Sequence, residues 1–286
     1  MVSADTQITE LAENDHACLT YCEPAELLDL TVAFIRDGLS AGLKLVWITD
    51  FATAQAVSQL TGRGVGVEPA LANGQLAPMA WQDGLLSEQG FDADHAMGWL
   101  TRQMTACEDE GFPGLRVAVD MGWALQPVPG VEQLPEFEKG VAAALPGTRV
   151  SVLCQYDRER FDPVTLASVA AVHTHSVAAA TYHADALLRI CRQYAPPGIR
   201  LAGEIDFQAD EPLALALAEA IRLDGDLTVN MADLHFIDVF CARMILNAAR
   251  GLATPRRIVL RCPPPLLRVF SLLEATDVPG VTLVPV

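Results

Sequence analysis

Several histidines and cysteines in the first part of the chain are of the types that bind metal ions. They lie at the start and at the end of this region: His16, Cys18, Cys22, Cys154, His173 and His175. Their spacing matches no common metal motif, because no C-x-x-C pair and no helical H-E-x-x-H occurs. Cys18 and Cys154 stand in apolar stretches, where a thiol is usually a small core residue. His173 and His175 are expected on a polar face after a helix, and we therefore predict no metal site.

Residue patterns for catalysis are equally weak. The chain has no G-x-S-x-G nucleophile turn, and residue order alone cannot establish a Cys-His or Ser-His-Asp set. Asp120 and Glu138 could be remnants of a metal-dependent ATPase. A working phosphate loop needs G-x-x-x-x-G-K-[ST], and in the nearest stretch, which begins at Gly38, Lys44 is displaced into a predicted strand. We therefore predict that the protein is not an enzyme and carries no cofactor.

The composition limits the classes of partner. The formal net charge is −17, with 25 acidic and 11 basic residues up to Gly198 and 11 acidic and 8 basic residues after it. Neither part has the positive surplus that binding to nucleic-acid phosphates requires. No apolar run reaches the roughly 18 residues of a membrane-spanning helix. The N-terminus lacks a secretory pattern and the seven cysteines are scattered, so we expect a cytoplasmic protein that binds proteins or small molecules.

Apolar runs alternate with amphipathic stretches from His16 onward, a pattern typical of an α/β protein with a mostly parallel sheet. The predicted strands of the first part cover residues 16–21, 43–50, 75–79, 115–121 and 149–157. The predicted helices cover residues 24–41, 52–61, 92–110, 132–144, 162–171 and 176–194. The sequence APPG then ends the last helix. We expect a first domain at 1–180, a helical linker at 181–198 and a second domain at 199–286.

Open α/β sheets usually bind ligands where their parallel strands end. The predicted strand ends supply a mixture of aromatic and polar side chains: Tyr21, Asp50, Asp120, Trp123, Gln155 and Tyr156. Such a group could hold a small organic molecule. The alternative is that the tyrosines are packing residues and the aspartates are caps, which is the more common role for each residue taken singly.

Seven alternating strands and helices follow in residues 199–286 and predict a second, smaller α/β domain. The segments GEID at 203–206 and ADLHFIDVFCARMIL at 232–246 resemble the STAS domain of anti-sigma factor antagonists. In that family the loop after the central strand reads roughly F-I/M-D-S-S/A-G, and a partner anti-sigma factor, a serine kinase of the HATPase type, phosphorylates its serine. The resemblance implies that such a partner binds at Asp206, Asp238, Val239, Phe240 and Cys241.

The matching loop in this chain has no hydroxyl group at the phosphorylated position. Asp238 is kept, but Val239 and Phe240 follow it and Cys241 stands in place of glycine. Asp238 also suits the N-cap of the next helix, a role that we weigh at least equally with partner contact. Phe240 could be an exposed anchor for the partner, but we favour a place in the core. We expect that phosphorylation of this loop does not control partner binding.

Several segments of residues 15–175 resemble the MEDS domain, a sensory module of regulators in methanogens and methylotrophs. The matching segments are DHACLTYCEPAELLDLTVAFIRDGLSAGLKLVWITD from residue 15, GQL at 74–76, GLRVAVDMGWAL at 114–125, Phe137-Glu138, and LCQYDRERFD at 153–162. The resemblance implies a fold related to the RecA/KaiC-type ATPases and a role in sensing rather than in hydrolysis of ATP.

Together, the two resemblances predict a regulator whose first domain senses a small ligand or a partner and whose second domain binds an anti-sigma factor. Control by a ligand requires that the ligand bind two states of the protein with different affinities. A constitutive scaffold whose domains have both lost their switch is the main alternative. A residual nucleotide-binding protein is the third.

Overall fold

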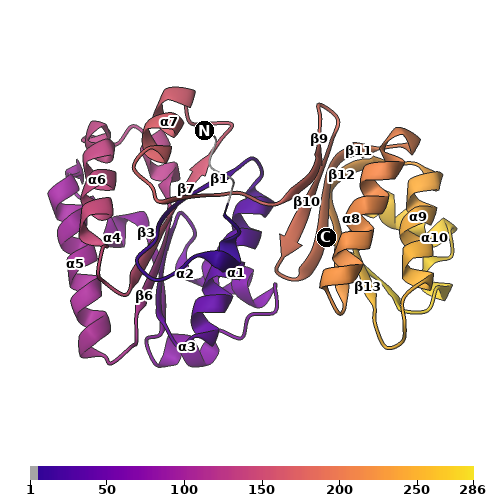
Figure 1. Ribbon diagram of the computed structural model, residues 1–286, viewed down its shortest axis with the longest axis horizontal. Helices are drawn as coiled ribbons and strands as arrows, with labels where there is room; N and C mark the ends of the chain where they lie inside the picture. Colours follow the sequence, from indigo (N-terminus) through magenta and orange to yellow (C-terminus); the bar gives the residue numbers. More distant parts are fainter. Residues whose placement is uncertain (1–5) are drawn as a thin grey trace. The chain divides into compact units, whose positions relative to one another are not determined.

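A parallel sheet of six strands forms the centre of the first part of the chain (Figure 1). The computed structural model describes residues 6–286, so residues 1–5 of the predicted first domain lie outside the described residues. The strand order is β3-β2-β6-β7-β1-β8. The strands of this sheet are β1 (His16–Tyr21), β2 (Lys44–Thr49), β3 (Leu76–Ala80), β6 (Leu115–Asp120), β7 (Val150–Asp157) and β8 (His175–Val177). A separate hairpin consists of β4 (Leu86–Ser87) and β5 (Gly90–Phe91).

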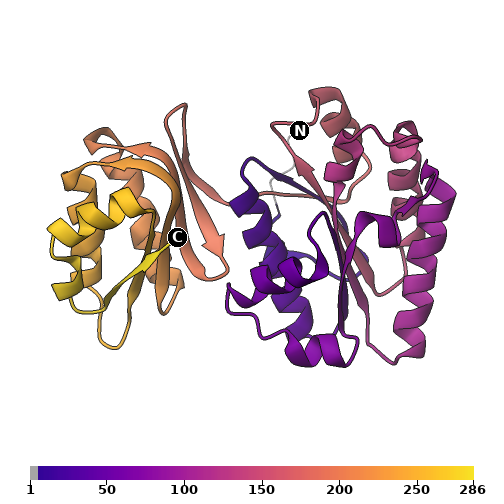
Figure 2. The same ribbon diagram turned by 180° about the vertical axis from the view of Figure 1, so that it is seen from behind.

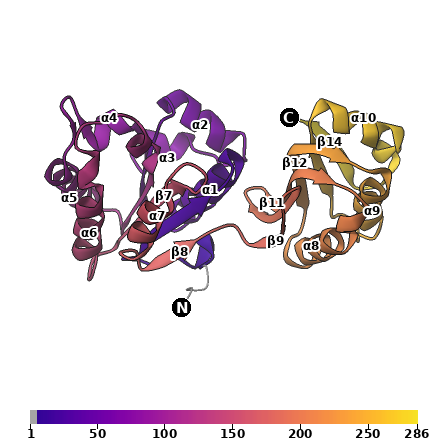
Figure 3. The same cartoon turned by 90° about the horizontal axis from the view of Figure 1, so that it is seen from above.

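Helices cover both faces of this sheet, with α5 and α6 on one face and α1 and α2 on the other (Figures 1 and 3). The helices are α1 (Pro24–Ser40), α2 (Thr53–Thr61), α3 (Glu68–Ala72), α4 (Trp81–Gly84), α5 (Ala93–Asp109), α6 (Leu134–Ala144) and α7 (Pro163–Ala170). Short 3-10 helices cover Ile8–Glu10, Met121–Leu125 and Val131–Gln133. Because both faces are covered, the strands are apolar along most of their length, as in β7, where every residue from Val150 to Tyr156 is buried.

Alternate residues of β7 point to opposite faces of the sheet. Cys154 and Tyr156 lie in the core beneath α5 and α6. Gln155 points to the other face, where its Nε2 donates a hydrogen bond to Oγ1 of Thr31 on α1 at 2.8 Å. Consecutive residues of this strand therefore contribute to different sites.

A second sheet of six strands, in the order β14-β13-β12-β11-β10-β9, forms the centre of the last part of the chain (Figure 2). Its strands are β9 (Thr181–Ala184), β10 (Leu188–Tyr194), β11 (Pro197–Ile205), β12 (Leu227–Ile237), β13 (Ile258–Cys262) and β14 (Val281–Pro285). Strands β9, β10 and β11 pair antiparallel, and β11 to β14 pair parallel. One face is covered by α8 (Asp210–Leu223), α9 (Val239–Arg250) and α10 (Pro264–Leu272). Short 3-10 helices cover Phe207–Ala209 and Ala275–Asp277.

The predicted helix at 176–194 and the helical linker at 181–198 are wrong. These residues form β8, β9, β10 and the start of β11. The alanine-rich composition favours a helix, but pairing of β10 with β11 buries Leu188 and Ile190 against the second core, and this packing overrides the local preference. The two compact units are accordingly Met1–Ala178 and Ala179–Val286, so the second unit begins well before the predicted boundary at Gly198.

The predicted α/β class is confirmed, with a parallel sheet between helices in the first unit and a smaller α/β second unit. None of the described helices is both long enough and apolar enough to cross a membrane.

Candidate functional site

Two neighbouring loops at one end of the second sheet carry the residues predicted to bind a partner. Strands β11 and β12 run parallel and end side by side, with Ile205 opposite Ile237. Asp238 follows β12 and caps α9, since its Oδ1 accepts a hydrogen bond from the Cys241 backbone N–H at 2.7 Å. Cys241 is buried, and its Sγ donates to the backbone oxygen of Asp206 at 3.2 Å, which joins the two loops. Asp238 therefore acts as the N-cap of α9, as the sequence predicted.

Large apolar side chains are exposed around these two loops. The exposed fraction is 52% for Val239, 53% for Phe240, 50% for Phe236 and 63% for Phe207. The expectation that Phe240 turns into the core is wrong. The buried stripe of α9 consists of Cys241, Ala242, Ile245, Leu246 and Ala249. Helical periodicity then places residues 239 and 240 on the outer side of the first turn.

A cavity of about 230 Å³ lies beside Phe236. Its walls come from the β9–β10 hairpin, the end of β11 and the 3-10 helix that follows: His183, Asp185, Leu187, Leu188, Glu204, Ile205, Asp206, Gln208 and Ala209. The hairpin that sequence analysis assigned to a helix thus forms one wall of the predicted partner site. The apolar residues Leu187 and Phe236 on its edge are 67% and 50% exposed.

Four of the six residues predicted to bind a ligand lie near one another at the strand ends of the first sheet. Asp120 pairs in register with Gln155, and Tyr21 ends the next strand on the same face. Burial raises the pKa of Asp120 to about 6. The hydrogen bond from the Gly122 N–H lowers this pKa, and the negative charge of the Asp50 carboxylate raises it further. Burial also raises the pKa of Tyr21, and the carboxylates of Asp120, Asp157 and Asp50 add to the effect. Binding of a ligand here stays a prediction.

The other two residues lie elsewhere. Trp123 is fully buried and its ring contacts Phe91, with ring centroids 4.4 Å apart. Tyr156 is also fully buried, and its hydroxyl donates to Oε1 of Glu138. Both side chains belong to the core beneath α5 and α6. Strand alternation turns Tyr156 away from the face that carries Gln155, whereas Trp123 lies in the 3-10 helix Met121–Leu125 that follows β6. The six predicted residues therefore do not form one crevice.

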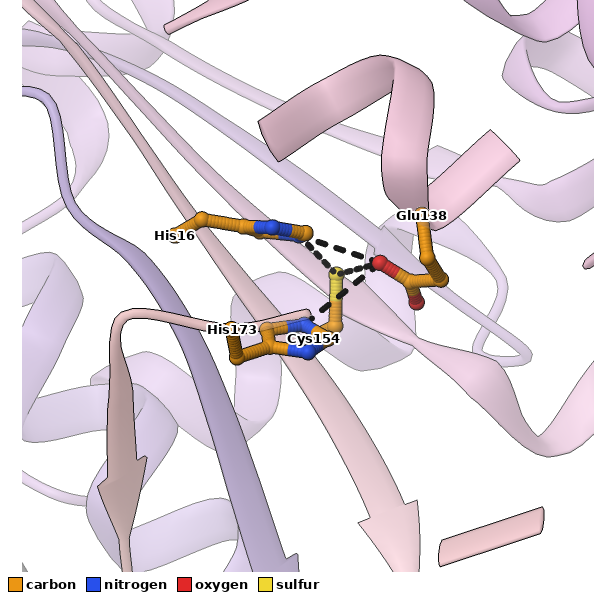
Figure 4. A group of neighbouring side chains, drawn as sticks. All are labelled: His16, Glu138, Cys154 and His173. Carbon is orange, nitrogen blue, oxygen red and sulfur yellow. Dashed lines mark hydrogen bonds and ion pairs between the residues drawn. The ribbon is translucent and has the colours of Figure 1, made fainter. Parts of the chain in front are cut away.

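Four buried side chains lie close together in the first unit (Figure 4), and three of them belong to the histidines and cysteines whose spacing in the sequence predicted no metal site. The group consists of His16 at the start of β1, Glu138 on α6, Cys154 in β7 and His173 between α7 and β8. The side chain of His173 is fully buried, so its expected place on a polar face is wrong. One signal was available, because Glu138 is an acidic residue within the apolar stripe of α6 that includes Phe137.

The ionisation of this group is set by its burial. Burial lowers the pKa of His173 to about 4, with the Glu138 carboxylate opposing the change. Burial alone would raise the pKa of Glu138, but hydrogen bonding to His16 and Tyr156 and the charge of the two histidines hold it below its usual value. Burial and the Glu138 carboxylate raise the pKa of Cys154 well above that of a free thiol. These four residues are of types that hold metal ions.

Comparisons with known proteins agree with the two-part organisation. The model of the MEDS family, described as MEthanogen/methylotroph, DcmR Sensory domain, matches residues 15–174. A STAS domain model, described as Mlab, STAS domain, matches residues 188–285. The curated transcriptional repressor DcmR of Methylorubrum extorquens is 29% identical over 160 residues, which are 54% of this chain and 57% of the repressor. The match therefore spans little more than half the length of that relative.

Two solved structures resemble this chain at low sequence identity. A KaiC-like protein from Pyrococcus horikoshii has a TM-score of 0.47 at 12% identity, over 64% of this chain and 79% of that protein. The flagellar accessory protein FlaH from Methanocaldococcus jannaschii has a TM-score of 0.44 at 10% identity, over 66% of this chain and 83% of that protein. Since the MEDS model matches more than half of the chain, this protein belongs to the MEDS family, with a STAS domain after its MEDS domain.

Proposed function

We propose that this chain is a regulator in which the MEDS domain detects a small molecule and the STAS domain binds an anti-sigma factor. The MEDS model describes a sensory domain, and the curated relative is a transcriptional repressor, which supports a role in regulation. STAS domains act by binding other proteins, and the surface described above supplies a place for such contact.

The observation that carries the proposal is the exposure of Phe207, Phe236, Val239 and Phe240 around the loops that join the ends of β11 and β12 to the helices that follow. Exposed apolar patches on folded proteins mark interaction sites, and aromatic side chains supply much of the binding energy at protein interfaces. Asp206 and Asp238 add fixed carboxylates beside the apolar residues, because each accepts a hydrogen bond from a backbone N–H. The surface therefore combines exposed apolar side chains with fixed carboxylates.

The chemistry of the loop determines how such binding could be controlled. Val239 and Phe240 stand where antagonists of this type carry a phosphorylated hydroxyl, so a kinase cannot add negative charge at these positions. Control must then come from another part of the chain, and the MEDS domain is the natural source. A ligand would change partner binding only if it bound two conformations of the protein with different affinity.

Calorimetric titration of the full chain with a purified HATPase-type anti-sigma factor from the same genome tests the proposal. Phe240→Ser is expected to weaken binding at least tenfold, because it removes an exposed aromatic anchor from the surface. Leu272→Ser is the matched control, since Leu272 is 84% exposed and lines a cavity with Asn247 and Arg250 near the other end of α9.

Equal binding by the wild-type chain and by Phe240→Ser would contradict the proposed surface. An equal loss in both variants would show that the effect is not specific to the loops after β11 and β12. Circular dichroism of each variant establishes that the second unit is folded before the affinities are compared.

A further inference from the structure

The four buried side chains of the first unit are arranged like the ligands of a tetrahedral metal ion. Oε2 of Glu138 lies 3.0 Å from Nε2 of His16 and 3.4 Å from Nε2 of His173. Sγ of Cys154 lies 3.6 Å from both Nε2 of His16 and Oε2 of Glu138. Bonds of about 2.0–2.3 Å to zinc place neighbouring ligand atoms of a tetrahedron roughly 3.3–3.8 Å apart. All four ligand atoms lie within 4.8 Å of one another, so one ion can reach each of them after small side-chain shifts.

The hydrogen bonds around the group orient the ligand atoms toward its centre. Nδ1 of His173 lies 2.8 Å from the backbone oxygen of Val169, which can only accept, so Nδ1 carries the hydrogen. Nε2 of a neutral His173 then presents a lone pair toward the Glu138 carboxylate, and it has no hydrogen-bond donor among the described residues. Two acceptors that face each other in a buried place repel, and a cation between them turns this repulsion into attraction.

The second oxygen of Glu138 is held in a similar way. The Tyr156 hydroxyl donates to Oε1, which leaves Oε2 directed at the two histidines and the cysteine. Metal ligands in proteins are commonly positioned by such outer hydrogen bonds, a carbonyl behind a histidine or a donor behind a carboxylate. His173 and Glu138 both have this arrangement.

We propose that His16, Glu138, Cys154 and His173 bind one divalent transition-metal ion, with Zn²⁺ the best fit. A thiolate, a carboxylate and two neutral imidazoles carry two negative charges, which a divalent cation neutralises in the dry interior. A mixed sulfur and nitrogen set in tetrahedral geometry suits zinc and excludes magnesium and calcium, which require oxygen ligands. With four protein ligands the site is closed, as in structural zinc sites rather than catalytic ones.

A cavity of about 240 Å³ lies between α6 and α7, next to the group. Glu138 lines this cavity, together with Val169 and Val172, which lie just before His173 in the sequence. Because His173 is in the segment between α7 and β8, a bound ion would tie this segment to β1, β7 and α6. The proposal does not depend on partner binding by the second unit.

Metal content and cobalt spectroscopy of the full chain test this site. The wild-type protein is expected to retain about one zinc ion per chain after purification, by mass spectrometry of the metal. After removal of zinc, added Co²⁺ is expected to give the intense visible bands of four-coordinate cobalt and a near-ultraviolet band from charge transfer between thiolate and cobalt. Cys154→Ser should lose the charge-transfer band, whereas Cys107→Ser, which changes another buried free cysteine, should keep it.

A second pair of variants tests the histidine ligand. His173→Gln is expected to weaken Zn²⁺ binding by roughly 100-fold or more, measured by competition with a chelator of known affinity. His175→Gln, a change two residues away at a partly exposed histidine that contacts Asp15, should bind Zn²⁺ like the wild type.

The cobalt spectrum of the wild type is informative even if a ligand variant fails to fold. A wild-type chain that takes up neither zinc nor cobalt in a one-to-one ratio, or that gives only the weak bands of six-coordinate cobalt, would overturn the proposal. Loss of the charge-transfer band in Cys107→Ser would overturn the assignment of Cys154 as the thiolate ligand.

Discussion

Asp120 shows how burial changes the chemistry of a single carboxyl group. It ends β6 on the face that carries Gln155, and it accepts a hydrogen bond from the Gly122 N–H at 2.8 Å. That hydrogen bond favours the charged form, but the loss of hydration outweighs it and raises the pKa from 3.8 to about 6. A carboxyl group with such a pKa can gain or lose a proton near neutral pH, as groups at functional sites often do.

The raised pKa of Asp120 predicts a change of stability with pH. Between 3.8 and about 6 the folded protein keeps a proton that the unfolded chain has released, so stability falls as pH rises through this range. Asp120→Asn cannot ionise and keeps an oxygen for the Gly122 N–H. We expect the stability of this variant relative to wild type to increase between about pH 4 and about pH 7, by at most roughly 3 kcal/mol.

Urea unfolding followed by tryptophan fluorescence measures this change in the first unit alone, because Trp47, Trp81, Trp99 and Trp123 all lie there. Asp109→Asn, a change at an exposed acidic residue, is the control. A stability difference between Asp120→Asn and wild type that is the same at both pH values would show that folding does not raise the pKa of Asp120.

At the scale of elements, the antiparallel pair β10–β11 shapes the cavity beside the predicted partner site. Gly203 lies in β11 with a φ of +96°, where the register with β12 shifts, and a Cβ at this position would overlap the backbone oxygen of Leu187. Glycine is therefore required for β11 to approach the start of β10 so closely. The same approach brings Leu187 to the cavity beside Phe236.

Gly203→Ala is expected to destabilise the second unit by roughly 1–3 kcal/mol, because alanine is strained at this φ and its methyl group forces the two strands apart. Gly225→Ala is the matched control, since a Cβ there meets no atom within 4 Å. Thermal unfolding of residues 179–286, followed by circular dichroism, gives the difference. Equal stability of the two variants would mean that β10 is not held against β11 as described.

At the scale of the whole molecule, the unit boundary determines which fragments can fold. Strands β9 and β10 form one edge of the second sheet, and Leu188 and Ile190 of β10 belong to its core. A fragment that begins at residue 199 lacks both strands and leaves the edge of β11 unpaired. The free N–H and C=O groups of such an edge can pair with another chain, so the fragment is expected to aggregate. A fragment that begins at Ala179 keeps the complete sheet.

We expect residues 179–286 to unfold cooperatively with urea and residues 199–286 to aggregate or to unfold without a clear transition. Circular dichroism and size-exclusion chromatography of the two fragments measure the difference. Cooperative unfolding of the shorter fragment with the same midpoint would place the boundary at Gly198 after all. The longer fragment is also the appropriate form of the isolated STAS domain for measurements of partner binding.

Features that depend on neighbouring residues could be predicted from the sequence. Alternating apolar and amphipathic stretches predicted the α/β class and most strands and helices, since these patterns follow from local geometry. The loop from Phe236 to Cys241 could be compared position by position with the family pattern, so the missing hydroxyl and the capping role of Asp238 were both predictable from residue order.

Contacts between distant residues, in contrast, depend on the tertiary structure. His16, Glu138, Cys154 and His173 come from four segments, and their meeting depends on the order β7-β1-β8 and on the packing of α6 over this part of the sheet. No spacing in the sequence records that order. The exposure of Phe240 and the strands at 181–194 were likewise determined by packing, because burying one face of a helix or pairing a strand lowers the free energy by more than local preference can.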